Sequence, residues 1–142
     1  MFALDSRLQQ DTLSLGDFGL CRLLLMNDAH YPWFILVPRR EEVSELFQLD
    51  EADQWALWQE TTQLAEVLKD MFAADKMNVA TLGNVVSQLH MHVIVRRRDD
   101  AAWPAPVWGR QPAQPYRDEQ VAAIRAKLRL VLTEGFVFDG AQ

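Results

Sequence analysis

The chain has 142 residues, of which 49% are hydrophobic, so it has the size of one domain with a single substantial core. Its formal net charge of -6 argues against a protein that coats extended nucleic acid, because such proteins carry a basic excess that neutralises phosphates. A small anionic ligand remains compatible with this charge, since a pocket can be locally positive on an acidic protein. We expect one domain over residues 1–142.

Cys21 is the only cysteine, so no disulfide within the chain is expected. Its apolar neighbours predict a buried and inert thiol. The first residues lack the basic start and long apolar stretch of a signal peptide. No segment approaches the roughly 20 apolar residues that span a bilayer. These features favour a reducing, cytoplasmic setting and no membrane partner.

The first predicted elements are two strands joined by a polar turn. Residues 20–26 are almost entirely apolar, and residues 33–37 are aromatic and β-branched and end at Pro38, which cannot donate to a sheet ladder. Asn27 and Asp28 supply turn chemistry between them. We expect the two strands to be neighbours in one antiparallel sheet.

A long helix is predicted over residues 50–71. Asp50 suits the N-cap, and Asp53 adds a negative charge to the first turn, which the helix dipole favours. Residues spaced three or four apart align on one helical face: Trp58, Thr62, Ala65, Leu68 and Phe72. We expect Trp55 and Trp58 to pack against the sheet or against a partner subunit.

The second half of the chain predicts two more strands and a final helix. The strands are expected over residues 77–83 and 88–95, with a loop at 84–87. Four prolines between residues 104 and 115 indicate an extended loop. A helix over 118–132, capped by Asp118, has an apolar side made of Val121, Ile124, Leu128 and Val131. The order of elements predicts an α+β fold with helices packed on an antiparallel sheet.

Candidate chemistry is concentrated on the strand over residues 88–95. Side chains of a strand alternate between faces, so Leu89 and Met91 enter the core with the following valines. Gln88, His90 and His92 then line the other face, with successive Cβ atoms roughly 6.5–7 Å apart. Two of the three histidines thus meet on one surface, which predicts the floor of a pocket.

Three interpretations of this pair remain open from local sequence. The imidazoles can simply lie on a solvated sheet face. They can supply two ligands of a metal site, which then needs a third ligand such as His30 or Asp28. They can also act on phosphate, with neutral His90 attacking phosphorus and His92 donating hydrogen bonds to the phosphoryl oxygens.

The segment resembles the motif of the histidine triad (HIT) family, His-x-His-x-His followed by apolar residues, with Gln88 where the first histidine is usual. The chain is similar to bacterial-type HIT-domain proteins over most of residues 20–108. The resemblance extends to further segments in the family's order: residues 27–39 with their Val-Pro-Arg ending, Asn78, the glycine turn at 83–87, and Trp103.

This resemblance implies a homodimer that binds a small nucleotide, needs no cofactor or metal, and cleaves at the α-phosphate. It implies that His90 is a nucleophile that forms a nucleotidyl-histidine intermediate, and that His92 holds a phosphate oxygen. It also implies substrate contacts outside the motif: ribose hydroxyls at Asn27 or Asp28, a base slot with Trp33 or Phe34, and contacts nearer the phosphate from Asn78, Asn84, Ser87 and Trp103.

Gln88 is a departure from the family pattern. An amide exchanges hydrogen bonds but carries no positive charge and relays no proton. The two histidines on one strand face, within this family resemblance, make the leading hypothesis a hydrolase or nucleotidyl transferase acting on a dinucleoside polyphosphate or a nucleoside phosphoramidate. Gln88 motivates the alternative, a nucleotide-binding sensor or scaffold with little catalysis, and a histidine metalloenzyme is the third. The basic run at residues 96–98 predicts a solvated strand end, and the alternative is that one of these arginines meets an anionic ligand or the acidic pair Asp99 and Asp100.

Overall fold

The computed structural model describes residues 1–140 and shows a mixed α/β fold built on one sheet. The sheet has six strands in the order β4-β5-β3-β2-β1-β6, and every pairing is antiparallel. The elements in chain order are α1 (Ser6–Asp11), β1 (Thr12–Phe18), β2 (Cys21–Met26), β3 (Trp33–Pro38), the 3-10 turn η1 (Leu46–Gln48), α2 (Glu51–Met71), β4 (Lys76–Ala80), β5 (Met91–Arg96), α3 (Asp118–Val131) and β6 (Phe136–Phe138).

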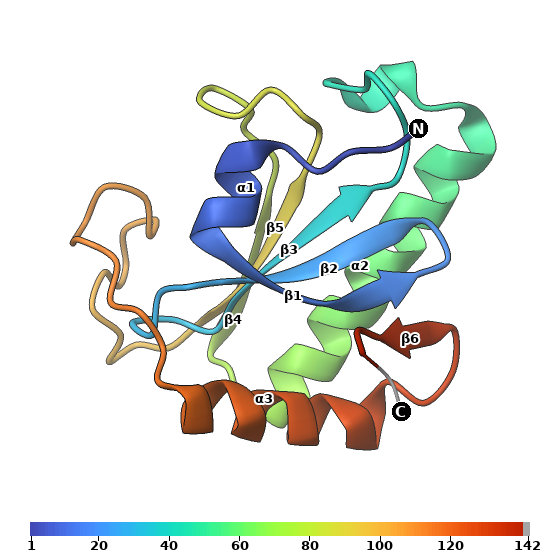
Figure 1. The fold of residues 1–142 in the computed structure, drawn as a ribbon. Coiled ribbons are helices and arrows are strands. Elements are labelled where there is room, and N and C mark those ends of the chain that lie inside the picture. The colour runs from blue at the N-terminus through green and yellow to red at the C-terminus, as the bar shows by residue number, and fades with distance from the viewer. Residues whose placement is uncertain (141–142) are drawn as a thin grey trace.

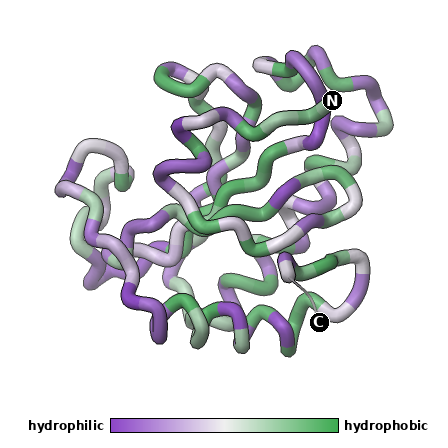
Figure 2. Tube along the Cα trace, in the orientation of Figure 1, coloured by the Kyte–Doolittle hydropathy of each residue, from purple (hydrophilic) through white to green (hydrophobic). Residues whose placement is uncertain are grey.

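The sheet separates two hydrophobic clusters, and its central strands carry the apolar residues (Figure 2). The larger cluster lies between the sheet and helices α2 and α3, and the smaller one lies beneath α1 and the loop that precedes α3 (Figure 1). Alternation along β5 sends Met91, Val93 and Val95 into the larger cluster, together with Leu89 just before the strand. The predicted apolar face of this segment is thus confirmed.

The long helix starts where the sequence predicts, because the Asp50 carboxylate accepts a hydrogen bond of 2.8 Å from the Asp53 backbone N–H. Its buried residues are Leu57, Thr61, Leu64 and Leu68, so Leu68 is confirmed, while the other three each precede a predicted residue by one position. Trp55 and Trp58 point outward and remain 62% and 53% exposed. Packing of these tryptophans against the sheet, one of the two expected roles, is therefore wrong.

Helix α3 also matches the prediction, although Asp118 is its first residue and Arg117 is the N-cap. Of its predicted apolar side, Ile124 and Leu128 are buried, whereas Val131 is partly exposed.

Cys21 is fully buried, and burial with the nearby Glu60 carboxylate raises the pKa of its thiol far above the ordinary value. No helix within residues 1–140 combines the length and apolar character needed to cross a membrane.

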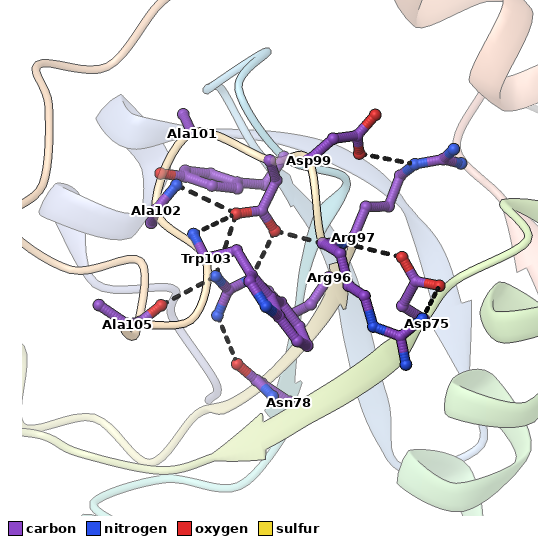
Figure 3. Close-up of polar contacts among 12 residues, drawn as sticks. Asp75, Asn78, Arg96, Arg97, Asp99, Ala101, Ala102, Trp103 and Ala105 are labelled. Atoms are coloured by element: carbon purple, nitrogen blue, oxygen red, sulfur yellow. Dashed lines mark hydrogen bonds and ion pairs between the residues drawn. The ribbon is translucent and has the colours of Figure 1, made fainter.

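Arg96 corrects the expectation of a solvated basic strand end. Its guanidinium is 1% exposed and donates to the Asp100 carboxylate, to Asn78 Oδ1 and to the Ala105 carbonyl (Figure 3). Burial alone would raise the pKa of Asp100, but hydrogen bonds from Arg96 and from three backbone N–H groups lower it to about 2. This ion pair ties the loop after β5 to the sheet.

Candidate functional site

His90 and His92 lie on the same side of the sheet, as the strand pattern predicts. Their ring centroids are 4.8 Å apart with the rings nearly perpendicular, and both side chains are buried. Both line one cavity of about 340 Å³, which falls within the range of small-molecule sites. The pair therefore forms part of a cavity wall and does not lie on an open, solvated sheet face.

Backbone geometry sets the proton position on His90. Its Nδ1 lies 2.7 Å from the Gln88 carbonyl oxygen, which can only accept a hydrogen bond. Nδ1 therefore carries the proton of the neutral ring, and Nε2 keeps its lone pair. A lone pair on Nε2 makes this imidazole a candidate nucleophile.

His92 has the opposite tautomer. Its Nδ1 accepts a hydrogen bond of 2.9 Å from the indole Nε1 of Trp33, so the proton of the neutral ring is on Nε2. Burial, with a smaller contribution from His90, lowers the pKa of His92 to about 3. His92 therefore stays neutral at physiological pH and offers an N–H donor.

The rest of the cavity wall comes from Met26 and Ile35 of the sheet and from three segments outside it. Helix α1 contributes Arg7, Leu8 and Asp11, and the loop before β5 contributes residues 82–86, which include Asn84. Trp108, from the proline-containing loop, closes the wall with its ring centroid 5.0 Å from that of His92. The cavity thus combines apolar walls with a few polar groups, as ligand sites do.

A second hollow of about 340 Å³ adjoins the first and shares Asp11, Met26 and Trp108 with it. Three of the predicted nucleoside contacts line this neighbour, namely Asn27, Asp28 and Trp33. The two polar side chains already accept bonds from the protein. Asn27 Oδ1 accepts from the Tyr116 N–H, and Asp28 Oδ1 lies 2.7 Å from Nδ1 of His30.

Comparisons with known proteins lead to the same family as the sequence motif. The HIT domain matches the chain over residues 7–99. The chain belongs to the HIT family. It is 50% identical to a histidine triad protein from Marinobacter aquaeolei VT8, with a TM-score of 0.92 and coverage of 95% of this chain and 98% of that one.

Two further histidine triad proteins are similar over nearly their whole length. The one from Sinorhizobium meliloti 1021 is 45% identical, with a TM-score of 0.91, and covers 93% of this chain and 98% of its own. The one from Bradyrhizobium japonicum is 43% identical, with a TM-score of 0.90, and covers 92% of this chain and 97% of its own. The comparison with curated proteins found no match.

Within this HIT fold, Gln88 is not placed as the sequence predicts. Both His90 and Gln88 precede β5, which begins at Met91, but only His90 lines the cavity with His92. The Gln88 amide instead accepts from the Asp5 N–H at 2.8 Å and donates to the Ala3 carbonyl at 2.8 Å. It does not line the histidine cavity.

Four other expected contacts lie away from this cavity. Phe34 is fully buried in the larger cluster, because neighbouring residues of β3 face opposite sides of the sheet. Asn78 and Trp103 surround the Arg96 guanidinium (Figure 3). Ser87 is exposed and lines a shallow hollow next to Gln88.

The sequence analysis missed Trp108 and the contribution of helix α1. Trp108 follows Trp103 in the same proline-rich loop, and local sequence holds no signal that distinguishes the two. Helix α1 has six residues, too few to show a periodic pattern. Among the described residues, no group of three or more His, Cys, Asp or Glu side chains is arranged to hold a metal ion.

Proposed function

We propose that this HIT protein is a hydrolase that cleaves a nucleoside phosphate derivative at its α-phosphate, with His90 as the nucleophile. The observation that supports the proposal is the pair of opposite tautomers in one cavity. His90 presents a lone pair on Nε2 and His92 presents a proton on Nε2, because their Nδ1 atoms have a carbonyl acceptor and an indole donor respectively.

The proposed reaction has two displacements at phosphorus. Nε2 of His90 forms a bond to the α-phosphorus while the bond to the leaving group breaks, and the leaving group departs with that electron pair. The positive charge that develops on the ring is stabilised by the Gln88 carbonyl, which accepts the Nδ1–H. Water then attacks phosphorus, breaks the P–N bond and releases a nucleoside monophosphate, with the water proton passing to solvent.

His92 would hold the phosphate during both displacements. Its neutral Nε2–H donates to a phosphoryl oxygen, and Trp33 fixes that donor in place without requiring a charged ring. Asn84, on the loop that lines the same cavity, adds a second donor through its side-chain amide. The adjoining hollow with Asn27 and Asp28 is the proposed place of the nucleoside.

A ligand screen followed by product analysis tests this function. Nucleoside monophosphates are expected to raise the melting temperature, because a ligand that binds only the folded state stabilises it. Dinucleoside polyphosphates and nucleoside phosphoramidates are then assayed as substrates. His90→Asn should abolish turnover while nucleoside monophosphate binding stays near normal. A fully active His90→Asn variant would disprove the assignment of the nucleophile.

A second candidate function is a nucleotide-binding sensor or scaffold with little catalysis. Gln88 favours it, because its amide is occupied by the N-terminal backbone and carries no ionisable proton. Monophosphate binding without turnover over a broad substrate panel would support this alternative. Metal analysis of protein purified without chelator tests the remaining metalloenzyme hypothesis, which predicts stoichiometric metal.

A further inference from the structure

We propose that Arg7 makes this site selective for substrates whose leaving group is an anionic phosphate, and that Gln88 is the positioning residue that keeps Arg7 at the cavity. This inference rests on the function proposed above. In this proposal α1 supplies a positive charge to the cavity. Gln88, at the first position of the motif, holds α1 in place and does not contact the phosphate itself.

Gln88 attaches the N-terminal segment to the motif loop. Both ends of its amide are used, since Oε1 accepts from the Asp5 N–H and Nε2 donates to the Ala3 carbonyl, each at 2.8 Å. These bonds join residues more than 80 positions apart in sequence. An amide suits this contact because it donates and accepts at once, and a neutral imidazole would have to do so with two nitrogens at fixed ring positions.

The attached segment is the start of helix α1. Asp5 is its N-cap, and the Asp5 carboxylate accepts from the Arg7 N–H at 2.8 Å. One turn along, Leu8 is buried in the smaller hydrophobic cluster under the helix. Gln88, Asp5 and Leu8 therefore fix both the position and the orientation of α1, which lies in front of the sheet (Figure 1) and lines the histidine cavity.

Arg7 brings positive charge to this cavity. It is the single lysine or arginine among the described residues that line the cavity with the histidines. Its partner is Asp11, with 3.7 Å between the closest nitrogen and oxygen atoms and both side chains more than half exposed. Such an exposed pair contributes little to stability, so a phosphate can replace the carboxylate as the partner of Arg7 at small cost. Without Arg7, Asp11 would repel an anionic ligand.

The groups available to donate a proton in the cavity also favour a phosphate as the leaving group. An amine must take up a proton as it leaves phosphorus, whereas a phosphate departs as a stable anion. Among the groups lining the cavity, His90 is the proposed nucleophile, and burial keeps His92 neutral. Arg7 does not release its proton in proteins, and Asp11 is the acidic partner of Arg7. The cavity thus stabilises negative charge on a leaving group but does not protonate one.

A binding experiment with Arg7→Gln tests the selectivity. The probes are adenosine and guanosine 5′-monophosphates and the corresponding α,β-methylene diphosphates, measured by calorimetry. For the unaltered protein we expect tighter binding of the diphosphate. Arg7→Gln should weaken diphosphate binding about three- to fivefold, as for a partly exposed ion pair, and leave monophosphate binding within a factor of two. Raising the salt concentration should reduce the preference.

Arg98→Gln is the matched control. Arg98 also forms an exposed ion pair at 3.7 Å, with Asp75, but it lies beyond the end of β5 and outside the cavity. This variant should keep the diphosphate preference. If Arg7→Gln weakened monophosphate and diphosphate binding equally, or weakened neither, this inference would be overturned but the proposed function would not. Failure of every probe to bind the unaltered protein would overturn the proposed function and this inference together.

Gln88→Ala tests the positioning role with a structural readout. Loss of both amide hydrogen bonds should speed backbone amide exchange in residues 5–11 and reduce the diphosphate preference as Arg7→Gln does. Exchange at His92 should be unchanged, since it lies within β5. A Gln88→Ala variant with normal exchange in α1 and a full diphosphate preference would contradict the role. Faster cleavage of a phosphoramidate than of a dinucleoside polyphosphate by the unaltered protein would contradict the leaving-group assignment.

Discussion

Trp33 donates from its indole Nε1 to Nδ1 of His92 across 2.9 Å, so a residue of β3 sets the proton position of a residue on β5. The two strands are adjacent in the sheet, and the rings are 5.8 Å apart between centroids. An indole only donates, which excludes a proton on the facing nitrogen. The N–H that His92 offers to the cavity thus depends on Trp33, whose side chain lines the neighbouring hollow.

Replacing Trp33 with phenylalanine keeps an aromatic ring and removes the donor. We expect kcat to fall about three- to tenfold, as for loss of one buried hydrogen bond, with a smaller change in KM. Nitrogen NMR of His92 should show the proton distributed between both ring nitrogens. Trp55→Phe, on the exposed face of α2, should change neither quantity. An unchanged tautomer in Trp33→Phe would contradict the role given to the indole.

The low pKa of His92 predicts acid sensitivity of the fold. In the unfolded chain this imidazole has a pKa of 6.5, and in the folded protein burial lowers it to about 3. The unfolded state therefore binds a proton that the folded state does not, and stability is lost as pH falls below 6.5. At pH 5 the loss from this group should be about 2 kcal/mol relative to pH 7.5.

Urea denaturation at the two pH values measures that loss. His92→Gln removes the titrating group, so its difference in unfolding free energy between the two pH values should be smaller by about the same 2 kcal/mol. All other ionisable groups are shared by the two proteins and cancel in the comparison. Identical pH dependence of the two proteins would show that His92 titrates normally in the folded state.

The buried ion pair in Figure 3 predicts that the neighbouring carboxylates of Asp100 and Asp99 contribute very differently to the free energy of unfolding. Asp100→Asn leaves the buried Arg96 guanidinium without a compensating charge and should destabilise the protein by about 3 kcal/mol. Asp99→Asn is the control, because Asp99 is 81% exposed and pairs only with Arg97, so its cost should stay below about 0.5 kcal/mol. Similar losses in the two variants would contradict the distinction.

The alternation of side chains along the strands and the N-cap of α2 were the parts of the fold that the sequence predicted well, whereas the N-cap of α3 is Arg117 instead of Asp118. The pairing of β2 with β3, the start of α2 at Asp50 and the shared side of His90 and His92 depend on residues close together in the chain, where local patterns are informative. Strands β1 and β6, at one end of the sheet, were missed. β1 carries mixed polar and apolar residues, and β6 has three residues, so neither shows a clear strand pattern.

Strand alternation predicted the shared side of His90 and His92, whereas the other residues found at the two hollows (Asn84, Asn27, Asp28 and Trp33) were expected only from the family resemblance. Gln88 was misplaced because it lies before the first pair of the β3–β5 ladder, Leu36 with Met91, where its amide bonds to the N-terminal segment instead. Its contacts with Ala3 and Asp5 join distant parts of the chain and leave no local signal. Arg96 was judged solvated from its basic neighbours, but alternation places it on the buried histidine side of the sheet.

The exposed tryptophans of α2 predict self-association, in line with the homodimer expected from the family resemblance. Trp55 and Trp58 line an open hollow on the outer face of this helix. We expect a dimer at micromolar concentration by sedimentation. If this face is the interface, Trp58→Ser should weaken the dimer by about 2 kcal/mol, as for a tryptophan at the centre of an interface. A monomeric mass for the unaltered protein would contradict the prediction.

The central claim is that Nε2 of His90 becomes bonded to the α-phosphorus during turnover. Rapid quenching under conditions that preserve phosphorus–nitrogen bonds, followed by peptide mass mapping, tests it most directly. The account predicts a nucleotidyl adduct on His90 in the unaltered protein, and no adduct and no turnover in His90→Asn. An adduct on another residue, or turnover by His90→Asn at the rate of the unaltered protein, would contradict it.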